Sequence, residues 1–378
     1  MIESAVPHST AAEAHSTRRP VHVLYYTGNL AVGGSEIHLS HLLTRMDRHR
    51  VRPELMLSRI PRDRTLIDRV EAAGVRIHEV GVAPGKRRVP RALARARRLI
   101  RQIRPDVLQT YGYPCDVYGP LLAGASRDIR VVTTRRGNQG IRHRWLLYRM
   151  TALLTDRVIC VSDSSREFAR RTQGLSHERS VVIPNGVDAT RFRPRTTRPG
   201  RIGEVGTHGR VKPIKGVDML LDAINLIEGA PRLRLAGPVN DRYGNELRER
   251  FGRSGSIEFV GEPDDIPGFL RSLDLYVLPS RSEGMSMALL EAMATGLPIV
   301  ATDVGSNRAV LADGAAGLVV APDPRSIADG IARMLREPQR ASELGRAARQ
   351  RVETEFSLDM MVRRFEEFYL QLVAEPAP

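Results

Sequence analysis

Two glutamates, Glu283 and Glu291, stand eight residues apart and could hold opposite ends of one ligand. Between them, Gly284, Met285 and Ser286 predict a loop that leads into a helix, with Ser286 as its N-cap. The first N–H groups of a helix have no partner inside it and favour an anion such as a phosphate, and a glycine lets that anion approach the backbone. Carboxylates accept hydrogen bonds from hydroxyls. The pattern therefore fits a nucleotide-sugar, with its sugar on Glu283, its diphosphate on the N–H groups and its ribose on Glu291.

The elements that must position these residues form one unit of a parallel α/β sheet. An apolar run over 274–279 predicts a buried strand, and 297–302 predicts the next one. The helix between them is expected to end near residue 295, because Gly296 and Pro298 follow. Such units and exposed glutamates are common in α/β proteins, so the spacing alone also fits an ordinary structural helix.

A second candidate phosphate-binding segment is GRVKPIKG at 209–216, which contains Arg210 and Lys215. Of the 58 basic residues only three are lysines, and two of these lie in this segment. A lysine kept against such an arginine bias suggests that a compact ammonium is needed there. The alternative is a solvated basic loop before a helix.

A third segment joins the predicted strand Val21–Thr27 to a helix that Ser35 is expected to cap. The connecting loop, GNLAVGG, ends in Gly33 and Gly34. Strand, glycine loop and helix is the phosphate-binding arrangement of a Rossmann-like domain, although a glycine loop is often only a tight turn.

The segment from Glu283, EGMSMALLEAMATGLPIVATDVGS, closely resembles the Glu-x7-Glu block of retaining GT-B glycosyltransferases, specifically glycosyltransferase family 4, also called group 1. GRVKPIKG resembles that family's Gly-Arg-x4-Lys-Gly block. GGSE at 33–36 and PNGVD at 184–188 resemble further elements of the same family. The resemblance covers about residues 21–373 and is strongest over 203–320.

The resemblance implies transfer of a hexosyl-type unit, with retention, from a UDP- or GDP-sugar to a saccharide or lipid-linked acceptor, such as an intermediate of surface polysaccharide. No metal or other cofactor is expected, since no Asp-x-Asp is suited to holding one between the phosphates. Fixed cations are expected to stabilise the leaving diphosphate instead. The residues implied are Glu283, Arg210 and Lys215 at the reacting centre, and Gly33, Gly34, Gly261, Gly284, Met285, Ser286 and Glu291 around the donor.

Three positions depart from the family pattern. Arg136 stands where members commonly carry a histidine after the fifth strand, and Gln109 lies in a stretch where another histidine is frequent. Ala309 replaces a glutamate after the second strand of the Glu-x7-Glu block. An arginine in place of the first histidine could hold a phosphate or carboxylate of the acceptor, so Arg135 and Arg136 are acceptor-side candidates.

The alternation of strands and helical segments in both halves predicts an α/β protein of GT-B type, with two Rossmann-like doubly wound domains and a cleft between them. We expect a mobile tail over 1–20, an acceptor domain over 21–189 and a linker over 190–200. A donor domain over 201–355 follows, and then a C-terminal helix over 356–378 that crosses back to the first domain.

The net charge of +15 is concentrated in residues 1–190, which hold 32 of the 58 Lys and Arg but only 17 of the 43 Asp and Glu. The segment 86–104 has nine basic residues, no acidic one and a single apolar stripe. This predicts a helix packed on the sheet or one lying in a membrane surface, and the arginine face of a packed helix could also reach anionic lipid.

No apolar run approaches the roughly 18 residues of a membrane span, and the N-terminus does not read as a signal peptide. We therefore expect a cytoplasmic protein in peripheral contact with the anionic inner face of the cytoplasmic membrane. Cys115 and Cys160 are expected to be buried free thiols.

Two other functions remain open: a nucleotide-sugar epimerase of the same fold, which the Glu-x7-Glu block argues against, and a non-catalytic basic module for membrane or nucleic acid. With only 5% aromatic residues the chain lacks the stacking surfaces of single-strand binding, so no nucleic acid is expected.

Overall fold

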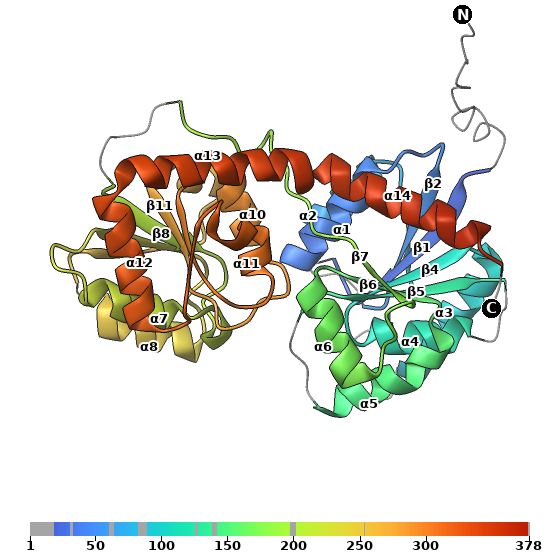
Figure 1. The fold of residues 1–378 in the computed structure, drawn as a ribbon. Coiled ribbons are helices and arrows are strands. Elements are labelled where there is room, and N and C mark those ends of the chain that lie inside the picture. Colours follow the sequence, from blue (N-terminus) through green and yellow to red (C-terminus); the bar gives the residue numbers. More distant parts are fainter. Residues whose placement is uncertain are drawn as a thin grey trace, which may run out of the picture.

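The structure is a computed structural model of the 378-residue chain. It describes residues 19–376, except 31–32, 60–63, 82–88, 125–127, 138–141, 197–201 and 253. Two α/β domains lie side by side, and a pair of long helices runs along one edge of both (Figure 1). Most of the predicted tail, residues 1–18, lies outside the described residues.

The N-terminal domain contains a seven-stranded parallel sheet in the order β3-β2-β1-β4-β5-β6-β7. Its strands are β1 (Val21–Thr27), β2 (Val51–Leu57), β3 (Arg76–Glu79), β4 (Val107–Tyr111), β5 (Arg130–Arg135), β6 (Arg157–Cys160) and β7 (Ser180–Val182). Its helices are α1 (Gly34–Arg45), α2 (Thr65–Ala72), α3 (Val89–Ile103), α4 (Cys115–Ala123), α5 (Arg142–Thr151) and α6 (Asp163–Gln173), with a 3-10 turn at Ala152–Leu154.

Both faces of this sheet are covered by helices, as a parallel sheet requires. Along β1, Val23 and Tyr25 pack with α1, α2 and the C-terminal helix, whereas Leu24 and Tyr26 pack with α3 and α4. Cys115 and Cys160 are buried free thiols, as predicted. Burial raises the pKa of Cys115 to about 12 and that of Cys160 to about 11, so neither is a reactive thiolate at neutral pH.

The C-terminal domain contains a six-stranded parallel sheet in the order β10-β9-β8-β11-β12-β13. Its strands are β8 (Glu204–His208), β9 (Arg232–Ala236), β10 (Ile257–Gly261), β11 (Leu275–Leu278), β12 (Ile299–Thr302) and β13 (Leu318–Val320). Its helices are α7 (Val217–Asn225), α8 (Arg242–Phe251), α9 (Ile266–Ser272), α10 (Met287–Ala294), α11 (Asn307–Val310), α12 (Pro324–Arg336) and α13 (Pro338–Glu355), with 3-10 turns at Pro213–Lys215 and Ala312–Gly314.

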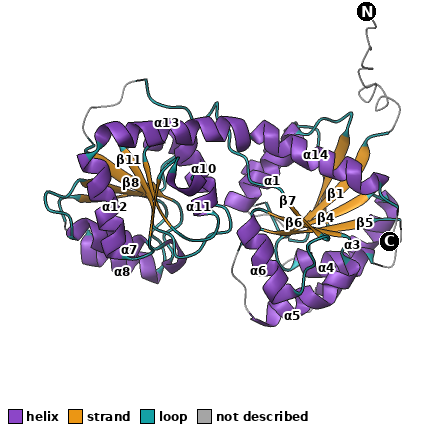
Figure 2. Ribbon diagram, viewed as in Figure 1, coloured by secondary structure: helices purple, strands orange, loops and turns teal. Residues whose placement is uncertain are grey.

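In each sheet the chain order reverses once, between β1 and β4 in the first domain and between β8 and β11 in the second. Ligands of doubly wound proteins bind beyond the carboxyl ends of the strands at such a switch point. Figure 2 colours the helices and the strands differently, so that the sheet of each domain can be told from the helices around it. The fold therefore provides two sites, one in each domain.

The chain passes between the domains twice, and the two passages lie together. Val187, after β7, donates from its N–H to the carbonyl of Phe356 at 2.9 Å, and its own carbonyl accepts from Leu358 N–H at 3.1 Å. The last helix, α14 (Leu358–Ala374), then packs on the N-terminal domain, as predicted. There the Tyr369 hydroxyl lies 2.9 Å from that of Tyr25 and donates to Gln109 Oε1 at 3.3 Å.

One detail differs from the predictions, and a second agrees with one of the two predicted arrangements. Ser35 does not cap α1, because the helix begins one residue earlier and Gly33 takes the N-cap position without a side-chain bond. The basic helix α3 packs on the sheet through Ala96 and Ile100. Among the described residues no helix is both long enough and apolar enough to cross a membrane.

Candidate active site

Glu283 and Lys215 meet beyond the carboxyl end of β11. Lys215 Nζ donates to Glu283 Oε1 at 2.7 Å, and Ser280 Oγ donates to the same oxygen at 2.7 Å. The Glu283 side chain is 9% exposed, so this carboxylate is held in place on one side, and no described residue bonds its Oε2. An open acceptor oxygen is available for a ligand hydroxyl.

A close backbone contact brings Lys215 to this position. Gly216 has a left-handed backbone with φ +64, and a Cβ atom there would lie 2.0 Å from the Pro279 carbonyl oxygen. Only glycine allows both the conformation and the approach. The turn Pro213–Lys215 therefore lies against the end of β11 and presents its ammonium to Glu283.

Glu291 is held by a residue that the sequence analysis did not identify. His208, the last residue of β8, lies with Nε2 2.7 Å from Glu291 Oε2, and its ring packs edge-on to Tyr276 with centroids 5.4 Å apart. The Glu291 side chain is 18% exposed, and no described residue bonds its Oε1. His208 thus orients the second glutamate at the switch point of the domain.

Arg210 and Gly261 lie at the carboxyl ends of β8 and β10. Arg210 is exposed and forms no hydrogen bond or ion pair with any described residue, so its guanidinium is available to an anion. Gly261 has φ +79, and no atom would lie within 4 Å of an added Cβ. The space beside this strand end is open.

The loop from Gly284 to Ser286 lies at the junction of the two domains. A Cβ at Gly284 would lie 2.4 Å from the Arg136 carbonyl oxygen, so the close approach of the other domain requires glycine here. Ser286 caps α10 by accepting from Leu289 N–H at 3.3 Å, as predicted. Met285 O accepts from Asn185 Nδ2 at 3.1 Å.

The glycine loop of the first domain faces the start of α10. A Cβ at Gly34 would lie 3.8 Å from Met287 Cγ, and Gly33 directly precedes α1 as its N-cap. Residues 31–32 of this loop lie outside the described residues. The loop and the helix start therefore meet across the domain junction.

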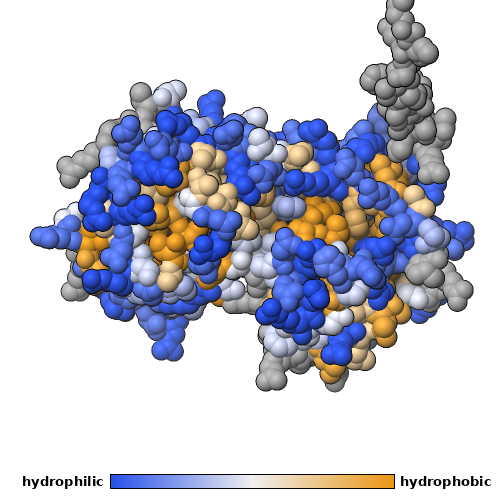
Figure 3. Space-filling view, in the orientation of Figure 1, coloured by the Kyte–Doolittle hydropathy of each residue, from blue (hydrophilic) through white to orange (hydrophobic). Residues whose placement is uncertain are grey.

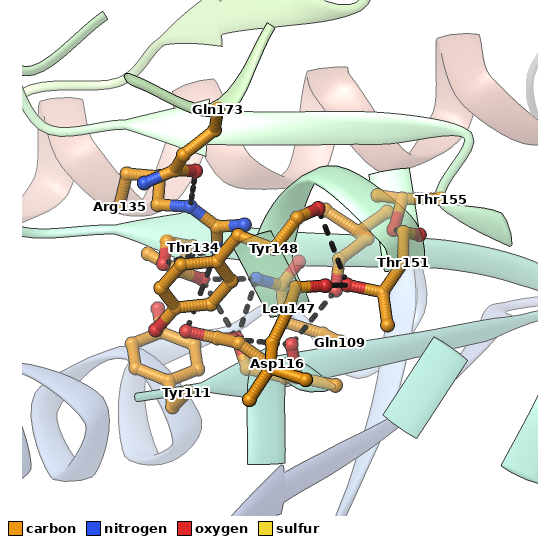
Figure 4. Close-up of polar contacts among 12 residues, drawn as sticks. Gln109, Tyr111, Asp116, Thr134, Arg135, Leu147, Tyr148, Thr151, Thr155 and Gln173 are labelled. Atoms are coloured by element: carbon orange, nitrogen blue, oxygen red, sulfur yellow. Dashed lines mark hydrogen bonds and ion pairs between the residues drawn. The ribbon is translucent and has the colours of Figure 1, made fainter. Parts of the chain in front are cut away.

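Arg135 and Arg136, adjacent in sequence, have different surroundings. Arg135 lies 3.5 Å from Asp116 Oδ2, donates from Nε to Gln173 Oε1 at 2.6 Å, and stacks 4.0 Å from the Tyr148 ring centre (Figure 4). Burial raises the pKa of Asp116, while the neighbouring Arg135 opposes that rise. Arg135 is thus engaged by internal partners.

Among the described residues no group of three or more His, Cys, Asp or Glu side chains could hold a metal ion. Lys215 contacts Glu283, and Arg210 follows the end of β8 by two residues. Ala309, which replaces the family's glutamate, is exposed on α11 and its carbonyl accepts from Arg351 at 3.2 Å.

Comparisons with known proteins identify the family. A model of Glycosyltransferase Family 4 matches residues 32–191, and a model of group 1 glycosyl transferases matches 203–337. The lipopolysaccharide core biosynthesis mannosyltransferase LpcC of Rhizobium leguminosarum bv. viciae is 32% identical over 253 residues, which cover 61% of this chain and 68% of LpcC. The chain belongs to glycosyltransferase family 4.

Two further comparisons are consistent with this assignment. The mannosyltransferase LpsB of Rhizobium meliloti (strain 1021), also named for lipopolysaccharide core biosynthesis, is 33% identical over 54% of this chain, and the match spans 64% of LpsB. The structure of Anabaena HepE in complex with UDP superimposes with a TM-score of 0.80 at 20% identity, over 93% of this chain and all of that one. This likeness shows the predicted GT-B fold.

For this family 4 member, sequence motifs indicated the paired glutamates and Lys215 but not their supporting partners. His208 stands two residues before Arg210 in the sequence, so its place at a strand end was a usable signal. Asp116 and Asn185 gave no such signal, because their partners Arg135 and Met285 are distant in sequence.

Proposed function

We propose that this protein transfers a hexosyl-type unit from a UDP- or GDP-sugar to a saccharide or lipid-linked acceptor, with retention at the anomeric carbon and without a metal. The observation that carries the proposal is the Lys215–Glu283 contact of 2.7 Å beside the N-terminus of α10. We assign Lys215, from the turn after β8, to the diphosphate, and Glu283, from the loop after β11, to the sugar hydroxyls. His208 and Glu291 supply the ribose side of the same site.

The chemistry demands stabilisation of the leaving nucleoside diphosphate, because negative charge grows on it as the bond to the sugar breaks. Lys215, Arg210 and the first N–H groups of α10 are the groups suited to accept that charge. Positioned cations and backbone dipoles need little rearrangement during the reaction, which is why they stabilise a transition state effectively.

We assign Glu283 to recognition of the sugar. One of its oxygens already accepts from Lys215 and Ser280, which holds the carboxylate in one orientation. The other oxygen can accept from a sugar hydroxyl, and a hydroxyl donating to a charged, largely buried carboxylate forms a strong hydrogen bond. This assignment places the reacting carbon between Glu283 and the diphosphate site.

The relatives support the choice of donor and acceptor. LpcC and LpsB are named mannosyltransferases of lipopolysaccharide core biosynthesis, and HepE was solved with UDP. For this chain they favour a nucleotide-hexose donor and an acceptor that is itself a glycolipid or a growing polysaccharide.

Calorimetric titration with UDP, GDP and ADP in the absence of metal tests the proposal. We expect one nucleotide to bind selectively, and Glu291→Ala to weaken it. With the matching nucleotide-sugar, free nucleotide should accumulate only when acceptor is present, whereas an epimerase would release none. Binding of none of the three nucleotides would overturn the proposal.

We further propose that the N-terminal domain contacts an anionic membrane through the outer layer formed by α3, α4 and α5. Eight large hydrophobic side chains of the described residues are exposed, and six lie on these three helices or within two residues of their ends. These six are Val89, Tyr113, Leu121, Leu146, Met150 and Leu153. Figure 3 shows hydrophobic side chains gathered over α4 and α5 at the lower right.

Basic side chains surround this apolar surface. In α3 the arginines at 91, 95, 97, 98 and 101 are exposed, and neither α3 nor α5 contains an acidic residue. Apolar side chains among arginines match the interior and the headgroups of an anionic bilayer. This surface supports membrane contact better than α3 alone, because the apolar stripe of α3 is turned toward the sheet.

Co-sedimentation with vesicles tests this contact. Binding to vesicles containing phosphatidylglycerol, but not to phosphatidylcholine alone, is expected at 50 mM salt and should weaken at 500 mM. Exchanging Leu146 and Leu153 for serine should reduce it. Leu226→Ser, which alters an exposed leucine of the other domain, is the matched control. Equal loss in the control, or no salt-sensitive binding, would contradict the proposal.

A further inference from the structure

A cavity of about 200 Å³ opens in the N-terminal domain beyond the carboxyl ends of β1, β4 and β5. Thr27, Tyr111 and Arg135, the last residues of these strands, contribute to its wall together with Arg136. Every lining residue lies between Thr27 and Gln173, so the cavity belongs to the N-terminal domain alone. It is the switch-point site of the first sheet.

Arg136 lines this cavity, and the hydrogen-bond partners of its guanidinium are all neutral. Its guanidinium donates to Ser35 Oγ at 3.3 Å, to His38 Nδ1 at 3.2 Å and to Asn185 Oδ1 at 2.9 Å. Burial and the neighbouring guanidinium hold the pKa of His38 well below its usual value, so that ring is neutral and accepts. Glu36 attracts the guanidinium without forming an ion pair with it.

The adjacent arginine provides an internal comparison. Arg135 lies 3.5 Å from the Asp116 carboxylate, and hydrogen bonds also hold it in place. No described carboxylate forms an ion pair with Arg136, although Glu36 of the same cavity wall attracts it, and burial lowers the pKa of Arg136. A partly buried cation without an ion-pair partner is costly, and a ligand anion would offset that cost.

Tyr111 is the second, independent sign of a ligand. The residue is 5% exposed, it lines the same cavity, and its hydroxyl is buried without a hydrogen-bond partner among the described residues. The Arg136 guanidinium lies 5.9 Å from the centre of its ring. A buried hydroxyl without a partner is uncommon in folded proteins, and an anionic oxygen would accept from it.

We infer that this cavity binds an anionic group of the acceptor, a phosphate or a carboxylate, through Arg136 and Tyr111. The inference rests on the proposed glycosyl transfer and narrows its acceptor to a phosphorylated or carboxylated saccharide. A neutral hydroxyl would leave the guanidinium without an ion-pair partner, since Glu36 attracts it but does not pair with it. The donor diphosphate has its own cations, Lys215 and Arg210, in the other domain.

Calorimetric titrations of the full-length chain with glucose 6-phosphate, glucuronate and glucose test the inference. At least one of the two anionic sugars should bind tenfold or more tightly than glucose. Arg136→Gln should remove that preference. Arg98→Gln, at an exposed arginine of α3 outside the cavity, should leave it unchanged.

Tyr111→Phe separates ligand binding from folding. Because the hydroxyl has no described partner in the free protein, its removal should not lower the thermal midpoint. It should nevertheless weaken binding of the anionic sugar by threefold or more. If Tyr111 had only a structural role, Tyr111→Phe would not weaken the binding of the anionic sugar.

Titration of the same variants with UDP and GDP distinguishes the two sources of phosphate. If Arg136→Gln weakens nucleotide binding but leaves sugar binding alone, Arg136 serves the donor and the inference is wrong. If nucleotide binds but no anionic sugar outcompetes glucose, the inference fails while glycosyl transfer stands. If anionic sugars bind and no nucleotide does, the cavity assignment stands and the proposed transfer fails. If Arg98→Gln weakened the binding of the anionic sugar as much as Arg136→Gln does, the cause would be a general attraction between charges, and this result would also overturn the inference.

Discussion

Lys215→Ala is expected to weaken the binding of UDP or GDP by about 10- to 30-fold. A hydrogen bond from an ammonium to a phosphate contributes about 1.5–3 kcal/mol, and a factor of ten corresponds to about 1.4 kcal/mol. The Lys215 side chain is 35% exposed, so solvent screens it and the lower half of that range applies. The substitution also removes one of the two described hydrogen-bond donors of Glu283 and leaves only Ser280. The negative charge of Glu283 is then less well compensated and repels the diphosphate more strongly.

Turnover should fall further than affinity. The charge on the diphosphate increases as the bond to the sugar breaks, so an ammonium contributes more in the transition state than in the bound donor. Replacing Glu283 by Gln in the Lys215→Ala background should recover part of the lost affinity, because the uncompensated carboxylate is removed.

Titration calorimetry with UDP and GDP in 0.1 M salt without metal measures the effect. Lys212→Ala is the matched control, since Lys212 lies three residues earlier, is 48% exposed and pairs with Asp241. A surface pair of this kind contributes little, so the control should stay within about twofold of wild type. The reasoning is refuted if Lys215→Ala also stays within twofold, or if the control loses as much.

Three further predictions concern stability. Burial lowers the pKa of His41 to about 4, below the value near 6.5 in the unfolded chain, so stability is lost as the pH falls from 6.5 toward 4, by up to about 3 kcal/mol. Scanning calorimetry at pH 7 and pH 5 should show a smaller drop for His41→Gln, and equal drops would contradict this. Tyr369→Phe removes two buried hydrogen bonds of α14 and should cost about 1–3 kcal/mol in urea unfolding, where an unchanged midpoint would count against it. Asp116→Asn leaves the Arg135 guanidinium buried without a counter-charge and should cost about 3–5 kcal/mol, and full stability would show that the pair is unimportant.

The strands could be predicted from sequence because both sheets are buried on two faces, which makes each strand an apolar run. The prediction was short where a charged residue is buried. The apolar pattern of the sequence indicates only 55–57 for β2, but the strand begins at Val51, because Pro53 and Glu54 interrupt that pattern. Glu54 is tolerated there since His78 of the neighbouring strand lies 2.7 Å from it. Such a partner depends on strand order, which local sequence does not reveal.

The candidate site was predictable where residues close together in the sequence fix each other's positions. The Ser286 cap and the two glutamates belong to one strand–loop–helix unit, so spacing located them. The different roles of Arg135 and Arg136 were not predictable. Arg135 ends β5 and Arg136 follows it, and the packing of α4, which carries Asp116, decides which of the two meets that carboxylate.

The pairing of Val187 with Ser357 has a mechanical consequence. The two chain passages between the domains are hydrogen-bonded to each other, so they form a double-stranded hinge that permits rotation about one axis and resists sliding. Opening of the two domains would break the hydrogen bonds that lie away from that axis, from Ser162 to Gly284 and from Asn185 to Met285. The Gly284 carbonyl would still accept from Ser306 of its own domain at 2.7 Å. The loop that we assign to donor binding would therefore keep its shape while the entrance widens, and substrate exchange would not require the proposed site to be rebuilt in each cycle.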